Sequence, residues 1–230
     1  MKRVLLIIAI VMSVFSIWAQ STGGKEFWLT FGQNGSGSYL VVNLQIRIVS
    51  GNDPTAGTIY FTNLGTEVHF NIGAHEVFTY RLDYPEDKGE RQSVYNTTMG
   101  VSNRSIRITS EEPVTVYALN QRGFSADATN ILPVKALDVD YYQISYTPFS
   151  VDAYAVVAIK DNTNLYHNKV WEETLDAGEV YYRTSSDDMT GSHITADNPV
   201  AFFAVTRTVQ IPADYEATDC LFQQLAPINT

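Results

Sequence analysis

The strongest constraint on this chain is a strict alternation of side chains between Tyr39 and Val49. Every second residue from position 40 to position 48 is Leu, Val or Ile, and most of the residues between them are polar. A period of two places all the apolar side chains on one face of a β-strand, whereas a helix would scatter them around its axis. The segment therefore predicts a strand with one buried face.

Short runs rich in Val, Ile, Thr, Tyr and Phe continue this pattern along the chain, and turn sequences such as Ser50–Pro54 and Asp161–Asn164 separate them. No convincing amphipathic helix exceeds about two turns. The sequence thus predicts an all-β fold of tandem antiparallel β-sandwich-like repeats packed together. The further runs are Thr58–Phe61, Glu67–Ile72, Glu76–Leu82, Ser105–Thr109, Val114–Leu119, Tyr141–Tyr146, Tyr154–Ile159, Glu179–Arg183 and Val200–Thr206.

Two blocks of sequence recur in the same order. Ile72–Arg81 resembles Leu175–Arg183, and Ile108–Ala118 resembles Ile194–Ala204. The first copy has the longer connection between its blocks, roughly residues 83–103. An internal repeat of this kind indicates two similar β units.

Each copy of the second block contains a Pro-Val pair after an acidic turn, at Pro113 and at Pro199. Proline lacks the backbone N–H that a central strand needs, so it is best tolerated where a strand begins. We therefore expect each proline to open a strand.

The repeat suggests a division of the chain into a signal peptide at residues 1–19, a first β unit at 20–122, a second at 123–218 and the start of a truncated third unit at 219–230. The third unit is suggested because Asp219, Cys220, Leu225 and Pro227 are arranged like Asp127, Ala128, Leu132 and Pro133. On this interpretation the 230 residues are the front of a longer protein or a clipped fragment.

The first residues resemble a secretory signal peptide. Lys2 and Arg3 precede the apolar run Val4–Trp18, and Ala19 stands before Gln20 as a small residue suited to cleavage. The run is shorter than the roughly 20 residues that cross a bilayer. We expect cleavage near Ala19 and a secreted or cell-surface protein without a transmembrane span in the mature chain; an uncleaved anchor is the alternative.

Charge and cysteine content exclude some classes of protein. The chain has 25 acidic and 15 basic residues, and loss of Lys2 and Arg3 would change the net charge from −10 to −12. Such a chain is not expected to bind nucleic acid, which needs a basic face. A single cysteine cannot form an internal disulfide, so packing must hold the fold.

The histidines and the cysteine offer no recognisable chemistry. None of His69, His75, His167 and His193 has the spacing of a metal site. His69 alternates with apolar neighbours and should face solvent, and His75 stands in a turn where the second copy has Gly178. Cys220 is expected to be a small buried apolar side chain.

Catalytic motifs are also missing from the sequence. It contains no G-x-S-x-G and no S-x-x-K, and the glycine-rich stretch Gly32–Ser38 lacks the lysine of a phosphate loop. We therefore expect a protein that is not an enzyme. No catalytic, cofactor-binding or metal residue is assigned, and the ligand-binding residues remain unassigned.

Two acidic turns leave a structural calcium ion as an open alternative. Calcium prefers oxygen ligands, which Asp161, Asn162 and Asn164 or the pair Asp187 and Asp188 offer. The other close carboxylates, Asp138 and Asp140, do not extend into a calcium-binding loop.

Tyrosine pairs are the remaining signal. Tyr141–Tyr142 and Tyr181–Tyr182 should each place one ring on either face of a sheet, so that one is buried and the other exposed. An exposed ring stacks on a sugar or anchors a protein partner; the alternative is that it covers neighbouring strands.

Taken together, several pieces resemble the amino-terminal domain of the IgGFc-binding protein family, over nearly all of Gly24 to Pro227. The pieces are Gly24–Phe31, Ile106–Ser110 with Pro113-Val114, Asp127-Ala128, Leu132–Val134, Tyr141-Tyr142, Ala158 with Asp161–Thr163, Leu175 with Ala177–Tyr181, and Thr190–Ser192. Two features depart from the family: Asp138 replaces its usual glycine, and the chain ends before the domain normally finishes.

The resemblance implies an extracellular, non-enzymatic binding domain of the kind found in exported surface proteins of the Bacteroidetes. We expect an adhesion or interaction module that recognises an extracellular protein or glycan, with mucin and immunoglobulin as candidates. The alternative is a structural or accessory sandwich domain of a longer surface protein or enzyme, and a hydrolase is a more distant one.

Overall fold

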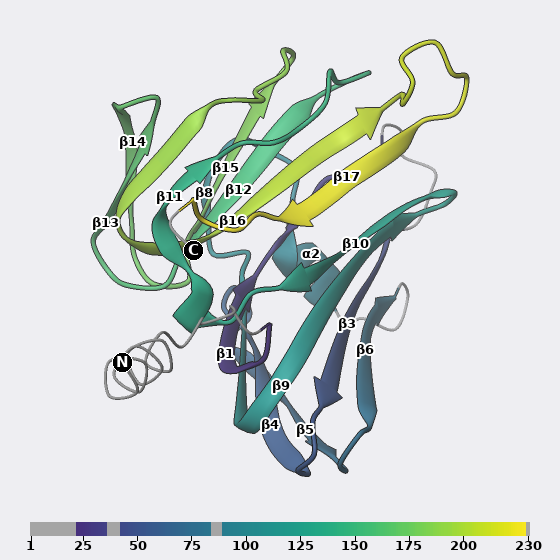
Figure 1. Ribbon diagram of the computed structural model, residues 1–230, viewed down its shortest axis with the longest axis vertical. Helices are drawn as coiled ribbons and strands as arrows, with labels where there is room; N and C mark the ends of the chain where they lie inside the picture. The colour runs from purple at the N-terminus through teal and green to yellow at the C-terminus, as the bar shows by residue number, and fades with distance from the viewer. Residues whose placement is uncertain (1–21, 36–41, 84–88, 229–230) are drawn as a thin grey trace, which may run out of the picture.

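Two curled antiparallel sheets, stacked on each other, make up the computed structural model of the chain (Figure 1). The structure describes residues 22–35, 42–83 and 89–228, so the predicted signal peptide lies outside the described residues. The prediction of an all-β, sandwich-like fold is confirmed. No helix in the described part of the chain is long and apolar enough to span a membrane.

The first sheet comprises β1 (Gly24–Leu29), β3 (Val42–Ser50), β4 (Thr55–Phe61), β5 (Thr66–Ile72), β6 (Val77–Asp83), β9 (Ile106–Arg122) and β10 (Ser125–Ile131). The second comprises β8 (Gly100–Ser102), β11 (Asp138–Tyr142), β12 (Asp152–Ala158), β13 (Thr163–His167), β14 (Val170–Leu175), β15 (Val180–Ser185), β16 (His193–Val209) and β17 (Asp219–Gln224). A short parallel pair, β2 (Phe31–Gly32) and β7 (Tyr95–Asn96), the helix α2 (Glu90–Val94) and the 3-10 turn η1 (Val134–Ala136) complete the described elements.

The two sheets share one topology. The first has the order β5-β4-β9-β3-β6 and the second β14-β13-β16-β12-β15-β8. β1 and β10 pair along β9 as β11 and β17 pair along β16. β9 and β16 are therefore matching central strands. β8 has no counterpart in the first sheet; it comes from the long connection after β6 and pairs with β15.

Strand pairing groups β10 with the first sheet and β17 with the second. The unit boundaries expected at 122/123 and 218/219 instead cut just before these strands. The similarity of residues 127–133 and 219–227 suggests that each segment begins a repeat unit. In the structure each segment instead follows the central strand of its own sheet and pairs with it.

Pro113 and Pro199 lie within β9 and β16, so the expectation that they open strands is wrong. Each central strand changes its neighbour at the proline. β9 pairs with β4 as far as Ser110 and with β3 from Val114 onwards, and the missing N–H falls in the gap. The separate runs around Pro113 are thus one continuous strand.

The larger hydrophobic core is shared by the two sheets. It contains the inward residues of the first sheet, such as Ile46 and Val116, and the outer face of the second sheet, including Val157 and Phe203. A second core fills the curl of the second sheet on the other side of β12. β12 is therefore buried on both faces.

The edges of the sheets also meet along β10 and β17, which lie side by side (Figure 1). The Phe222 N–H donates to Asp127 Oδ2 at 2.8 Å, and the Gln224 N–H donates to Thr129 Oγ1 at 2.9 Å. The Leu132 N–H donates to Gln224 Oε1 at 2.8 Å. Side chains thus satisfy edge groups that would otherwise be open to another strand.

The turn between β14 and β15 touches the first sheet at Gly178. Ser105 Oγ donates to the Gly178 carbonyl at 2.6 Å. Gly178 has φ +89°, and a Cβ added to it would lie 2.9 Å from Thr62 Cγ2. Only glycine supplies this backbone conformation while leaving room for the neighbouring sheet.

Replacing Gly178 tests this contact, and Gly191 offers a matched control. Gly191 has φ +86°, but nothing lies within 4 Å of an added Cβ. Gly191→Ala should cost about 1 kcal/mol of unfolding free energy, from the backbone alone. Gly178→Ala should cost about 2–4 kcal/mol, since overpacking adds to the same strain. Urea denaturation followed by circular dichroism measures both; equal losses would contradict the close approach.

Candidate functional site

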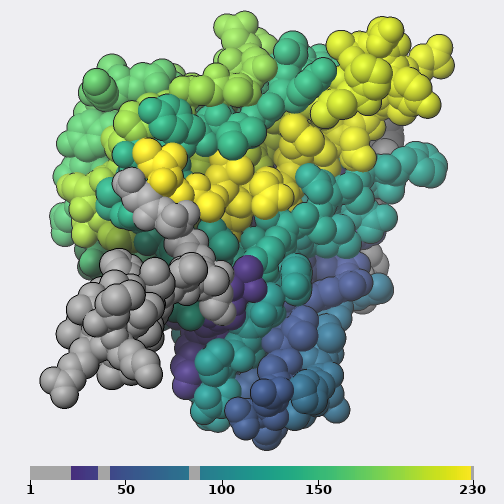
Figure 2. Space-filling model, viewed as in Figure 1, coloured from purple at the N-terminus to yellow at the C-terminus, as the bar shows by residue number. Residues whose placement is uncertain are grey.

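Three connections meet at one end of the molecule: the turn between β9 and β10, the segment 143–151 before β12, and the segment 210–218 between β16 and β17. The Phe149 N–H donates to the Thr208 carbonyl of β16 at 2.8 Å, and Phe149 lines a small depression together with Gln210 and Ala213, so the second connection lies against the third. Phe124 and Tyr215 line one depression, so the β9–β10 turn also lies against segment 210–218. Figure 2 shows this hairpin turn and the loop projecting from the body.

Six large apolar side chains are exposed on these connections: Phe124, Ile144, Tyr146, Phe149, Ile211 and Tyr215. We call four of them, Phe124, Phe149, Ile211 and Tyr215, the loop-end face. Phe124 is fully exposed, and the others are 55–63% exposed. Buried aromatic residues are the usual anchors of protein interfaces, and scattered single apolar residues are common on any surface. Their convergence on three adjoining connections distinguishes this group.

Polar contacts fix the base of the loop-end face. Asp152 is fully buried, and its carboxylate accepts hydrogen bonds from Ser145 Oγ at 2.7 Å, Thr206 Oγ1 at 2.8 Å and the Met189 N–H at 2.8 Å. It thereby joins the connection 143–151 to β16. Within the outer loop, Gln210 Nε2 donates to the Tyr215 carbonyl at 2.7 Å. The apolar side chains thus stand on ordered backbone.

The charged side chains on the three connections and at their ends are all negative. Within residues 123–127, 143–151 and 210–219, every one of which the structure describes, the charged side chains are Asp127, Asp214, Glu216 and Asp219, and none is basic. Asp214, Glu216 and Asp219 are exposed. A partner with basic groups around an apolar contact would complement this rim.

Cys220 lies beneath the rim and is 3% exposed. Burial raises the pKa of its thiol to about 11, and the carboxylates of Asp219 and Asp127 act in the same direction. The prediction of a buried apolar role is confirmed. A thiol in this state is a poor nucleophile because the thiolate is the reactive form.

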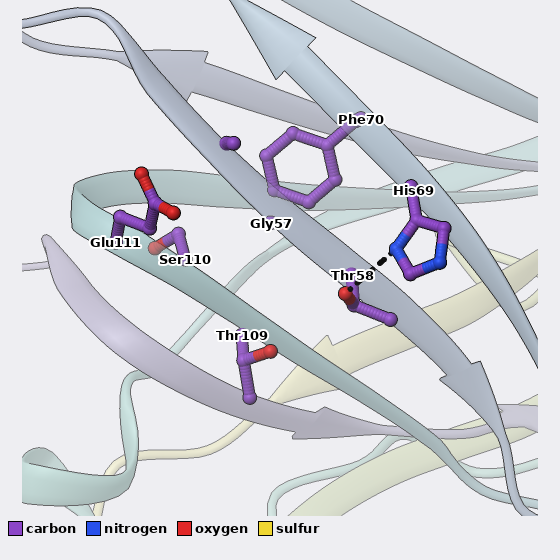
Figure 3. Close-up of a pocket in the computed structure, with 8 residues that line it drawn as sticks. Gly57, Thr58, His69, Phe70, Thr109, Ser110 and Glu111 are labelled. Carbon is purple, nitrogen blue, oxygen red and sulfur yellow. Dashed lines mark hydrogen bonds between the residues drawn. The ribbon is translucent and has the colours of Figure 1, made fainter.

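A second hollow lies on the first sheet, where β4, β5 and β9 adjoin (Figure 3). The Phe70 ring covers Gly57, with a ring carbon 2.3 Å from the position of an added Cβ. Thr58 and His69 stand at one end of the hollow, joined by a 3.2 Å hydrogen bond, and Ser110 and Glu111 at the other. Phe70 is only 4% exposed, so its ring is not available to stack on a sugar.

The two tyrosine pairs differ in the exposure of their rings. Tyr141 is fully buried and Tyr142 is 45% exposed, as the alternation predicts. Tyr181 and Tyr182 are both buried, so the expectation of one exposed ring there is wrong. The reason is that β15 has core on both faces: Tyr181 belongs to the second core and Tyr182 to the shared core.

Tyr181 belongs to a polar network inside the second sheet. Its hydroxyl donates to Glu172 Oε2 at 2.6 Å, and Arg183 Nη1 pairs with Glu172 Oε1 at 2.6 Å. Burial raises the pKa of Tyr181 to about 12, and its hydrogen bond to Glu172 acts in the same direction. Burial also lowers the pKa of His167, which contacts Tyr154 Oη at 3.1 Å. These groups satisfy one another.

The other three histidines lie in different settings: His69 is on a strand surface, His75 is in a turn, and His193 pairs with an acidic side chain. The side chain of His69 is 76% exposed, as predicted. His75 has φ +59°, in the left-handed region that Gly178 also adopts, which explains their exchange in the repeat. His193 Nε2 lies 2.5 Å from Asp140 Oδ1, and its ring stacks on Tyr142 with centroids 4.7 Å apart. No pattern in the sequence indicates this last contact.

In the two turns considered as calcium sites, the carboxylates accept hydrogen bonds from nearby groups of the protein. Asp161 Oδ1 accepts the Ala177 N–H at 2.9 Å, and Asn164 is held by Asp197. Asp188 Oδ1 accepts the Thr190 N–H at 2.9 Å, and the hydrogen bonds from Thr190 lower the pKa of this carboxyl group. Among the described residues no group of three His, Cys, Asp or Glu side chains is placed to hold a metal ion.

The glycine-rich stretch 32–38 is described as far as Gly35. Gly32 belongs to β2, and an added Cβ would lie 2.7 Å from Val205 Cβ, so this glycine permits close packing of the second sheet. Asn34 is buried, and its Nδ2 donates to the carbonyls of Asn120 and Ser125. The described part of the stretch is structural.

The fold is a pair of packed antiparallel sheets that carries the loop-end face on three adjoining connections. Residues 127–230 match the model of one protein family, described as IgGFc binding protein. The resemblance inferred from the sequence is thereby confirmed for this part of the chain, which holds most of β10 and the whole second sheet except β8. No curated protein and no solved structure matches the chain.

The state of Cys220 can be tested with a thiol reagent. At pH 8 a thiol with a pKa near 11 carries roughly 100-fold less thiolate than an ordinary exposed one. Labelling of the native protein by Ellman's reagent should therefore be at least that much slower than labelling of the urea-unfolded protein. Rapid labelling of the native state at pH 8 would contradict the buried thiol.

Proposed function

We propose that this protein is an exported, non-enzymatic binding module, secreted or held at the cell surface, that recognises an extracellular protein through the loop-end face. The observation that carries the proposal is the convergence of Phe124, Ile211 and Tyr215, all more than half exposed, on adjoining connections. The family match supports a binding role with a protein partner. The amino-terminal apolar run supports export.

Binding residues are commonly found on loops that a rigid sheet scaffold positions. Phe124 and Tyr215 present large rings with few rotatable bonds, so little conformational entropy is lost when a partner covers them. The acidic rim would speed association with a basic protein surface and make it dependent on salt. No catalytic, cofactor-binding or metal residue is needed for this function.

The proposal predicts that a double variant, Phe124→Ser with Tyr215→Ser, loses binding. Binding of the mature chain to immunoglobulin Fc, to mucin and to a glycan array is measured by biolayer interferometry. Two aromatic anchors worth about 2 kcal/mol each would together change the affinity roughly 1000-fold. Trp171→Ser, at an exposed aromatic residue of β14, is the matched control and should bind as the wild type does.

Raising the salt concentration from about 0.05 M to about 0.5 M should also weaken binding, because it shortens the screening length. The proposal is refuted if the wild type binds none of the three probes, or if the double variant binds a probe as tightly as the control does. Binding to the glycan array alone would overturn the protein partner in favour of a sugar.

A further inference from the structure

The tip of the β9–β10 hairpin and the loop between β16 and β17 lie at the same end of the molecule, and a hollow opens between them (Figure 2). We call it the loop-end hollow. Its volume is about 540 Å³, within the range of pockets that hold small ligands. Its lining combines two aromatic rings, apolar walls and two carboxylates, which come from Phe124, Tyr215, Val209, Ile211, Asp127 and Asp219.

Asp219 uses one carboxylate oxygen to hold the start of β17 against β10. Its Oδ1 accepts hydrogen bonds from Ser125 Oγ at 2.7 Å, from the Ala126 N–H at 3.0 Å and from the Cys220 N–H at 2.8 Å. Its Oδ2 accepts no hydrogen bond from any described residue, and the side chain is exposed. The carboxylate is therefore fixed in position while one of its oxygens is left for a ligand.

Asp127 brings a second negative charge to the loop-end hollow. Its Oδ2 accepts the Phe222 N–H at 2.8 Å, and its Oδ1 accepts the Ala128 N–H at 2.8 Å. Among the described residues no Lys or Arg lines the hollow. The nearest basic residue along the chain, Arg122, is 7% exposed and donates from Nη1 to the Asn34 carbonyl at 3.1 Å. The two carboxylates therefore lack a cation in the lining of the hollow.

The other walls suit a long side chain with an apolar stem. Phe124 is fully exposed and Tyr215 is 62% exposed, so a ligand can cover either ring. Ile211, which is 55% exposed, adds apolar surface beside them. The hydrogen bond from Gln210 Nε2 to the Tyr215 carbonyl, at 2.7 Å, holds the loop that carries this ring. The hollow thus offers apolar contact next to negative charge.

An arginine side chain combines the groups that such a lining recognises. Its carbon stem packs on apolar surface, and its planar guanidinium stacks on an aromatic ring while its N–H groups donate in pairs to a carboxylate. A lysine ammonium is a more strongly hydrated point charge and cannot form the paired hydrogen bonds. An apolar side chain would cover the charge of Asp219 without giving it a partner, which costs free energy.

We propose that the loop-end hollow receives an arginine side chain of the partner protein, with the guanidinium paired to Asp219 and stacked on an aromatic ring of the hollow. Asp127 strengthens the attraction as a second negative charge. This inference rests on the proposed function of the loop-end face, and it specifies the chemistry of the partner: an arginine that projects from an apolar surface.

Three short peptides test the proposal: acetyl-Gly-Arg-Gly-amide and the same peptide with lysine or with citrulline in place of arginine. Citrulline has the shape of arginine without its charge. Each peptide is titrated into the isotope-labelled mature chain, and NMR follows the backbone amide signals of the residues that line the hollow. The arginine peptide should bind with a Kd on the order of 1 mM. The citrulline peptide should bind at least about 10-fold more weakly, and the lysine peptide several-fold more weakly.

Two variants separate the charge from the ring. Asp219→Asn removes the charge but keeps an acceptor oxygen for the three donors, and it should weaken binding of the arginine peptide at least about 10-fold. Tyr215→Leu keeps an apolar wall without the ring and should weaken binding about 2- to 5-fold. Glu216→Gln is the matched control, because it removes the same charge from an exposed residue of the same loop that does not line the hollow. It should bind as the wild type does, and circular dichroism checks that each variant is folded.

The proposal is overturned if the arginine peptide shifts no signal of the hollow, or if the citrulline or lysine peptide binds as tightly. Equal effects of Asp219→Asn and Glu216→Gln would also overturn it, since they would indicate only general attraction to an acidic surface. Failure of the arginine peptide, together with loss of Fc or mucin binding in the double variant of Phe124 and Tyr215, would reject the arginine and keep the proposed function. Binding of the peptide, but of none of the three larger probes, would do the reverse.

Discussion

Burial of the outer face of the second sheet against the first holds the two halves of this molecule in one arrangement. Val157 and Phe203 each contribute roughly 1.5–3 kcal/mol when fully buried, and many such side chains share the same core. Small residues such as Ala155 and Gly32 allow the close approach. The double burial of β12 and the placement of the Gly178 turn both follow from this contact.

The fold class could be predicted because a strand with one buried face has apolar and polar side chains in alternation. β6 follows that rule from Val77 to Leu82, and β3 follows it in part, since Gln45 is buried as well as its neighbours Leu44 and Ile46. The rule fails where a strand is covered on both faces: β12 is buried at every position, and Tyr181 and Tyr182 are both enclosed. The continuity of β9 through Pro113 could not be predicted either, because it depends on β9 changing its pairing partner from β4 to β3, which lie elsewhere in the sequence.

The candidate site was only partly visible in the sequence. Apolar residues within turn sequences, such as Phe124 after Gly123 and Ile211 before Pro212, are a local signal. Their meeting depends on three connections that are distant along the chain, as does the burial of Asp152. The sequence of the acidic turns is compatible with a calcium site or with local hydrogen bonding. The carboxylate oxygens of Asp161 and Asp188, which could bind calcium, accept hydrogen bonds from nearby N–H groups instead.

The strand β8 has a consequence for what counts as an independent piece of this protein. It leaves the first half of the chain, crosses over and lies against Val180–Tyr182 of the second sheet. The stretch that the family comparison recognises, residues 127–230, does not include it. Of the first-sheet residues in the shared core, that stretch contains only Ile131 of β10. The segment recognisable by sequence is therefore smaller than the packed structure to which it belongs, and the second sheet is completed by β8 from the first half of the chain.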